Sequence, residues 1–154
     1  MNTLDKSARM GLIPQAFVNM AICYDLFSHR LERSMRPLGL NMTSVSLLNH
    51  FSWDPKRSWT VSELVQVMGI HQPGITKAVK SMLDKGFLTR QVDEHDARVK
   101  HLFVSDLGMK TLAQVRELTF PILAEAYAAV PDSQLEALAA ALGVLKSGLE
   151  STRP

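Results

Sequence analysis

Apolar residues recur at helical spacing through the first quarter of the chain. Between residues 10 and 36 the repeated positions are Phe17, Met20, Ala21, Tyr24, Phe27, Leu31 and Met35. This spacing predicts a long helix, because side chains three and four residues apart share one face. Pro14 is expected in its first turn, and Pro37 and Gly39 are expected to end it. A second helix is expected to start after Thr43.

The pattern after residue 59 is that of two short helices separated by a tight turn. Thr60 and Glu63 have the spacing of a capping box, which predicts a helix that ends at Gly69. A second helix follows, with Gln72 as its expected cap and Pro73 at its first position. Its buried stripe is formed by Ile75, Val79, Met82 and Leu83. Gly86 is placed to end it in the left-handed conformation.

Two apolar segments, 87–92 and 99–104, flank a charged stretch at 93–98 and predict a hairpin. A helix, a turn, a second helix and a hairpin, in this order, form a winged helix-turn-helix. We therefore expect a mainly α fold with a small β wing, flanked by N- and C-terminal dimerisation helices.

The last third of the chain is predicted to be helical. Ser105 is expected to cap a helix that runs to about Ala129 and that Pro121 kinks or interrupts. The final helix carries leucines three and four residues apart, at positions 135, 138, 142, 145 and 149. This seam and the apolar first helix exceed what one small domain can cover, so we expect a homodimer.

The chain is expected to form a single domain over 1–154 with two parts. Segments 6–52 and 106–152 are assigned to a helical dimerisation region. Segment 53–105 is assigned to a winged helix-turn-helix lobe that binds DNA.

The second helix of the pair has a polar face opposite its buried stripe. That face contains Gln72, Gly74, Thr76, Lys77 and Lys80. Short polar residues at a helix N-terminus suit contacts to base edges, and lysines farther along suit phosphate. The same pattern also fits a solvated amphipathic helix. His71, just before the helix, is either a turn residue or a base reader.

The wing offers a second group of candidate DNA contacts. Arg98 near its tip is suited to the minor groove, where arginine is attracted by the negative potential. Asp96 is expected to hold the Arg98 guanidinium in a bidentate pair. Arg90 and Lys100 on the strands are candidates for phosphate contacts. An exposed Asp–Arg ion pair without any function is the alternative.

Composition narrows the function classes. The formal net charge of +2 is small, although residues 71–104 carry six basic and four acidic side chains. No apolar run approaches the roughly 18 residues of a membrane span, so no membrane partner is expected. One cysteine cannot form an internal disulfide, which fits the cytoplasm. The histidines have no metal-site spacing and no phosphate loop follows a strand, so we expect neither a metal, a cofactor nor an enzyme.

The motifs at 60–64, 72–80, 83–90, 96–98 and 104–108 resemble those of the MarR (multiple antibiotic resistance regulator) family of winged helix-turn-helix transcriptional regulators. The resemblance is strong over 60–108 and elsewhere rests on the order of helices. It implies a homodimer that binds a palindromic operator in double-stranded DNA. It also implies a repressor that a small, often aromatic, effector releases from DNA.

Two further hypotheses concern regulation. Phe27, His50 and Trp53 are candidates to line an effector pocket, although aromatic residues at helical spacing also build cores. Cys23 lies in the first helix, where some members of the family carry a peroxide-sensing cysteine. A buried structural thiol is the favoured interpretation of Cys23, and a cysteine-based redox sensor is the alternative. A winged-helix protein-interaction module without DNA binding is the other alternative.

Overall fold

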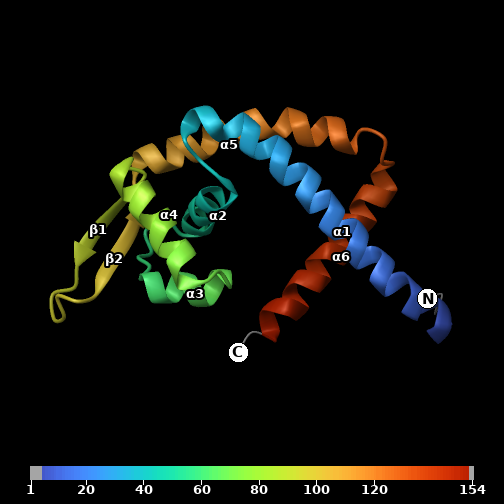
Figure 1. Cartoon of the computed structure of the whole chain (residues 1–154), viewed down its shortest axis with the longest axis horizontal. Helices are drawn as coiled ribbons and strands as arrows, with labels where there is room; N and C mark the ends of the chain where they lie inside the picture. Colours follow the sequence, from blue (N-terminus) through green and yellow to red (C-terminus); the bar gives the residue numbers. More distant parts are fainter. Residues whose placement is uncertain (1–4, 153–154) are drawn as a thin grey trace. The chain divides into compact units, whose positions relative to one another are not determined.

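The computed structural model describes residues 5–152 and shows helices with a small hairpin (Figure 1). The elements, in chain order, are α1 (Lys6–Met35), η1 (Arg36–Leu38), α2 (Met42–Trp53), α3 (Val61–Met68), α4 (Gln72–Asp84), β1 (Leu88–Val92), β2 (Lys100–Val104), α5 (Asp106–Tyr127) and α6 (Asp132–Ser151). The two strands form an antiparallel sheet. The expected fold class, mainly α with a small β wing, is therefore confirmed.

The first helix, α1, begins earlier than the sequence indicated. It starts at Lys6, so Pro14 lies inside the helix and not in its first turn. The end of the helix agrees with the prediction, because η1 contains Pro37 and is followed by Gly39 at φ +65°. Apolar contact with the core is confined to the last turns of α1, where Met35 is 1% exposed.

The core lies between α2, α3, α4 and the hairpin. Asn41 caps α2 by accepting a hydrogen bond from the Ser44 amide at 2.9 Å. The helix therefore starts at Met42, two residues before the expected start. Leu47 and Phe51 of α2 are fully buried, and the helix packs against α4 and β2. Consequently α2 shares its core with the helix pair and the hairpin. The assignment of residues 6–52 to the dimerisation region stays a prediction.

The helix pair forms as its local sequence dictates. The capping box of α3 is present, with the Glu63 amide donating to Thr60 Oγ1 at 3.2 Å and the Thr60 amide donating to Glu63 Oε2 at 2.7 Å. Gly69 ends α3 at φ +63°. In α4 the N-cap is His71, so Gln72 is the first helical residue and not the cap. No side chain caps this end of α4.

The hairpin is tied to both neighbouring segments. Its register pairs Leu88 with Val104 and Val92 with Lys100. Trp59, just before α3, extends the sheet by exchanging two backbone hydrogen bonds with Leu102, at 3.0 and 2.8 Å. Gly86 makes the turn from α4 into β1 at φ +72°, as predicted.

The start of α5 is fixed closely against the base of the wing. Ser105 Oγ accepts the Gly108 amide at 3.0 Å and donates to the Gly86 carbonyl at 2.6 Å, which confirms Ser105 as the cap. Gly108 is buried, and the backbone of Phe87 leaves no room for a side chain there. Farther along, α5 continues through Pro121 to Tyr127, so the proline does not interrupt it.

The chain divides into two compact units, 1–119 and 120–154. The second unit contains the end of α5 and all of α6, and α6 has no buried residue. The leucine seam is therefore uncovered within one chain, with Leu135 37% and Leu149 61% exposed. In the first unit α1 is equally uncovered over most of its length, with Phe17 65% exposed.

One helix of the described residues, Lys6–Leu38, is long and apolar enough by length and composition to cross a membrane. The expectation that no segment approaches this length is therefore wrong, because an 18-residue window of this helix is apolar on average although polar residues interrupt it. Signal sequences and core helices of soluble proteins meet the same criterion. The apolar surface of α1 is exposed in the single chain, so another molecule has to cover it. Length and composition do not distinguish a membrane from a protein partner.

Candidate nucleic-acid interface

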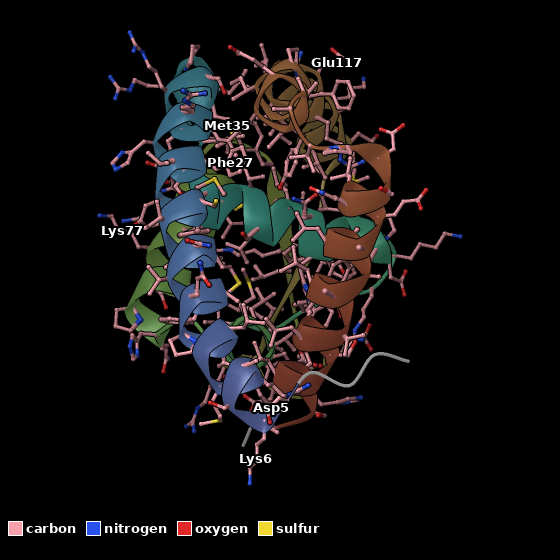
Figure 2. All side chains as sticks on the ribbon, turned by 90° about the vertical axis from the view of Figure 1, so that its right-hand side faces the viewer. Asp5, Lys6, Phe27, Met35, Lys77 and Glu117 are labelled. Carbon is pink, nitrogen blue, oxygen red and sulfur yellow. The ribbon has the colours of Figure 1, made fainter. Side chains whose placement is uncertain are left out.

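The outer face of α4 is polar and open to solvent. The buried stripe is formed by Ile75, Ala78, Val79 and Met82. The residues expected to contact DNA are all exposed, namely His71, Gln72, Gly74, Thr76, Lys77 and Lys80. Lys77 points away from the body of the lobe (Figure 2). The two faces of the helix are therefore separated as the sequence predicted.

Gly74 has an internal packing role as well as an exposed position. A Cβ on Gly74 would lie 3.2 Å from Cγ2 of Ile70, in the turn before the helix. The glycine thus lets the turn pack closely on the first turn of α4. This contact adds a second reason for glycine to the expected one, which was close approach to DNA.

The N-terminal end of α4 has no side-chain cap among the described residues. Pro73 has no N–H, and the Gly74 amide donates to the His71 carbonyl at 2.9 Å, so the Gln72 amide is the first-turn donor left for an outside group. The helix dipole favours an anion such as phosphate at this end. The side chains of Gln72 and Thr76 lie on the same exposed face.

The wing carries exposed cations, but the expected Asp96–Arg98 ion pair is not formed. Asp96 Oδ1 accepts the backbone amide of Arg98 at 2.9 Å, and no ion pair joins it to the guanidinium in the described residues. In a turn, the short aspartate side chain accepts a hydrogen bond from the nearest backbone amide more readily than it reaches a distant guanidinium. Arg98 is therefore held by its main chain, while its side chain is exposed, as are Arg90 and Lys100.

Asp93 and His101, which the sequence analysis did not single out, organise the wing. His101 Nε2 lies 3.0 Å from Asp93 Oδ2. Asp93 Oδ1 accepts the amides of His95 at 2.9 Å and Asp96 at 3.0 Å. The hydrogen bond from His101, followed by those two amides, lowers the pKa of Asp93. The carboxylates of Asp93 and Asp96, two acceptors within one turn, are a local sequence signal for these hydrogen bonds to backbone amides. The role of His101 has no such signal, because it depends on contacts between residues distant in the sequence.

A cluster of aromatic rings lies at the end of α2. His50 packs against Trp53 at 5.1 Å and against Trp59 at 4.4 Å between ring centroids. The Arg57 guanidinium lies 3.8 Å from the centre of the Trp59 ring. Burial, followed by the charge of Arg57, lowers the pKa of His50, so its imidazole is neutral at pH 7.

This cluster contains two buried polar atoms, His50 Nε2 and Trp59 Nε1, that have no hydrogen-bond partner among the described residues. Buried polar groups are nearly always hydrogen-bonded, so adjacent unpaired nitrogens mark a place where a polar group or water can bind. Trp53 is 73% exposed at the edge of the cluster. Of the residues proposed for an effector site, His50 and Trp53 are thus brought together. Trp59 and Arg57 were missed.

The other two regulatory candidates lie on α1. Phe27 is half-buried on this helix (Figure 2). Cys23 is exposed in the single chain, so the expectation of a buried thiol is wrong. Its neighbours on α1 are exposed as well, since the helix contacts the lobe only near its end. Within residues 5–152, no three His, Cys, Asp or Glu side chains are grouped as metal ligands.

A comparison with protein-family models finds a match in the middle of the chain. Residues 38–99, which include the helix pair and most of the wing, match the model of the MarR family. This segment is therefore similar to the winged helix-turn-helix part of that family. The match begins in η1 and ends within the hairpin, so it contains the polar face of α4 and the wing tip.

Solved structures show that the MarR fold extends over nearly the whole chain. A MarR transcriptional regulator from Methanosarcina mazei is 18% identical, with a TM-score of 0.75 and coverage of 89% of this chain and 99% of that one. A cysteine-to-serine mutant of E. coli MarR, complexed with operator DNA, is 16% identical, with a TM-score of 0.71 and coverage of 88% and 95%. An organohalide-sensing regulator in its 2,4-dichlorophenol-bound form is 14% identical, with a TM-score of 0.76 and coverage of 97% and 88%.

Proposed function

We propose that this protein is a cytoplasmic, homodimeric transcriptional regulator that binds a palindromic DNA operator and represses until a small molecule releases it. The observation that carries the proposal is the exposed polar face of α4 above a buried apolar stripe. The match of residues 38–99 to the MarR family model supports it, as does the likeness to a regulator crystallised with operator DNA.

In this proposal α4 is the recognition helix. Gln72 and Thr76 contact base edges in the major groove, while Lys77 and Lys80 contact phosphates. A bidentate contact to a base discriminates by about 1–3 kcal/mol, whereas a lysine–phosphate contact adds affinity without sequence preference. His71 is placed to contribute at the N-terminal end of the helix.

Arg98 reads the adjacent minor groove in this proposal, and Arg90 and Lys100 contact phosphates. The exposed guanidinium supports the assignment, because it has no ion-pair partner among the described residues. Its main chain is nevertheless fixed by Asp96 at 2.9 Å, which limits the entropy lost when the side chain binds DNA.

Selection from a library of random duplex DNA tests the proposal. We expect the wild-type protein to enrich a palindrome, and Arg98→Ala to bind that duplex at least ten-fold more weakly. Lys110→Ala, which removes an exposed cation from α5, is the control for net charge and should leave binding unchanged. Failure to enrich any sequence would favour a winged-helix protein-interaction module.

The homodimer is supported by the exposed apolar surface of α1 and α6. Large exposed apolar side chains on these helices include Met10, Phe17, Tyr24, Leu26, Leu138, Leu142 and Leu145. Soluble monomers rarely leave so many apolar groups in contact with water, and a second copy of the chain can cover them. Sedimentation without detergent should give a dimer at micromolar concentration. A stable monomer, or a protein that needs detergent, would contradict this assignment.

The effector site is assigned to the aromatic cluster of His50, Trp53 and Trp59, with Phe27 of α1 as a further wall. Two unpaired buried nitrogens and an exposed indole suit an aromatic molecule that carries a hydrogen-bonding oxygen. The chain has only two tryptophans, and both lie in this cluster. Titration with 2,4-dichlorophenol should therefore change the tryptophan fluorescence and weaken DNA binding over the same concentration range. A fluorescence change without DNA release would refute the coupling.

A further inference from the structure

His101 lies where the wing joins the rest of the lobe. Its Nε2 is 3.0 Å from Asp93 Oδ2, and its Nδ1 is 3.3 Å from Oγ of Ser58, which precedes Trp59 in the segment before α3. The His101 and Asp93 side chains are only 32% and 30% exposed. Partial shielding from water makes this contact stronger than an ion pair on an open surface.

Asp93 links His101 to the wing tip through further hydrogen bonds. While Oδ2 faces His101, Oδ1 accepts the amides of His95 and Asp96. Asp96 in turn accepts the amide of Arg98. A continuous series of hydrogen bonds therefore runs from Ser58 through His101 to the backbone of Arg98.

The imidazole can hold both partners in either protonation state. With its proton on Nε2, neutral His101 donates to Asp93 and accepts from the Ser58 hydroxyl. When protonated, it donates to both and forms a charge-assisted bond with Asp93, which is shorter and stronger than a neutral one. The charged groups that face it are Asp93 in the wing and Glu63 at the start of α3, with Arg57 beside Glu63.

We propose that His101 is a positioning residue for DNA binding, which fixes the wing tip through Asp93 and does so more firmly when protonated. This inference rests on the proposed function, because it concerns the affinity of the wing for DNA. Because protonation of the imidazole strengthens its contact with Asp93, the affinity for DNA should rise as the pH falls. Protonation also offsets the negative charge of Asp93 near the phosphates.

Three variants separate positioning from charge. His101→Phe removes both hydrogen bonds, whereas His101→Gln keeps an amide donor toward Asp93 but cannot be protonated. Asp93→Asn removes the carboxylate on the other side of the contact. His29→Gln, an exposed histidine of α1, is the control for the loss of a titrating group elsewhere. The probe is a labelled duplex enriched by the wild-type protein, and its dissociation constant is measured at pH 6, 7 and 8.

We expect His101→Phe and Asp93→Asn to bind about five-fold more weakly than wild type at pH 6. His101→Gln should bind like wild type at pH 8 but gain about five-fold less affinity on going to pH 6. His29→Gln should keep the wild-type profile. Wild-type affinity for His101→Phe at pH 6, together with a wild-type pH profile for His101→Gln, would overturn the proposal.

A measurement without DNA keeps the inference separate from the proposed function. Nitrogen-15 relaxation of the backbone amides of residues 93–98 reports motion on the picosecond to nanosecond timescale. These amides should become more mobile in His101→Phe and remain ordered in His101→Gln. If no duplex binds even the wild-type protein, the proposed function fails, and unchanged relaxation in His101→Phe would then overturn the positioning role as well.

Discussion

Gly108→Ala tests how firmly the wing is joined to α5. An ideal Cβ on this residue would lie 2.3 Å from the backbone oxygen of Phe87 and 3.0 Å from Cγ2 of Val104. The oxygen of Phe87 also accepts the Ser105 amide at 3.0 Å. The alanine methyl therefore cannot be accommodated by rotating a side chain. Either the first turn of α5 or the turn between α4 and β1 has to move.

The expected change in the free energy of unfolding is the sum of one favourable and two unfavourable contributions. Alanine gains at most about 1 kcal/mol over glycine through its helix propensity, and less in a first turn than in a helix interior. Overpacking in a tightly filled site costs about 1–3 kcal/mol. A weakened hydrogen bond between Ser105 and Phe87 costs about 1 kcal/mol more. The free energy of unfolding of Gly108→Ala should therefore fall by about 1–3 kcal/mol, although a helical glycine has been replaced by the best helix former.

Urea unfolding followed by circular dichroism measures this loss, with all proteins at the same concentration because dimerisation contributes to stability. Gly148→Ala is the matched control, since a Cβ there meets nothing within 4 Å. That variant should be more stable than wild type by about 0.5–1 kcal/mol. If Gly108→Ala is also as stable as wild type or better, the close contact between α5 and the wing base does not exist in solution.

Three further predictions concern the cap of α3, the buried histidine and the recognition helix. Thr60→Ala should lower the free energy of unfolding by about 1 kcal/mol in the same urea experiment, because the first-turn amide of Glu63 loses its acceptor; no loss would mean that water replaces the cap. The pKa of His50 is lowered from its ordinary value of 6.5 in the folded protein, so the unfolded chain binds the proton first. The stability that neutral His50 allows is thus fully present above pH 6.5 and declines as the pH falls toward the lowered pKa; His50→Leu should show a smaller loss between pH 7.5 and 5.5, and an identical loss would contradict the assignment. Lys80→Ala should reduce the slope of log affinity for duplex DNA against log salt by about one, and an unchanged slope would remove Lys80 from the phosphate contacts.

Local sequence patterns predicted the elements whose hydrogen bonds close within a few residues. The capping box of Thr60 and Glu63 and the left-handed turn at Gly86 formed as expected, because each depends only on the backbone next to it. The polar face of α4 was predicted for a related reason, since the apolar stripe at Ile75 and Val79 fixes the orientation of the helix. These two kinds of signal were sufficient to identify the helix pair and the wing.

Predictions failed where neighbouring groups competed for the same partner. Asp96 was expected to bind the guanidinium of Arg98 but accepts its backbone amide. The amide is closer, and this bond does not restrict the long arginine side chain.

The start of the first helix was also predicted wrongly. Pro14 was placed in the first turn of α1, but the helix starts at Lys6 and continues through it. A proline removes one hydrogen bond from a helix, and that loss does not end a helix of this length.

The contacts that sequence patterns could not reveal join distant parts of the chain. Ser58 and His101 are separated by 43 positions, and no periodicity or motif relates them. They meet because Trp59 pairs antiparallel with Leu102 through backbone hydrogen bonds, which places the residues before each of them diagonally across the same face of the sheet. The same pairing brings Trp59 against His50 of α2. One short bridge therefore places both the histidine that positions the wing and the tryptophan of the candidate effector site, so a ligand that displaces Trp59 would act directly on the base of the wing.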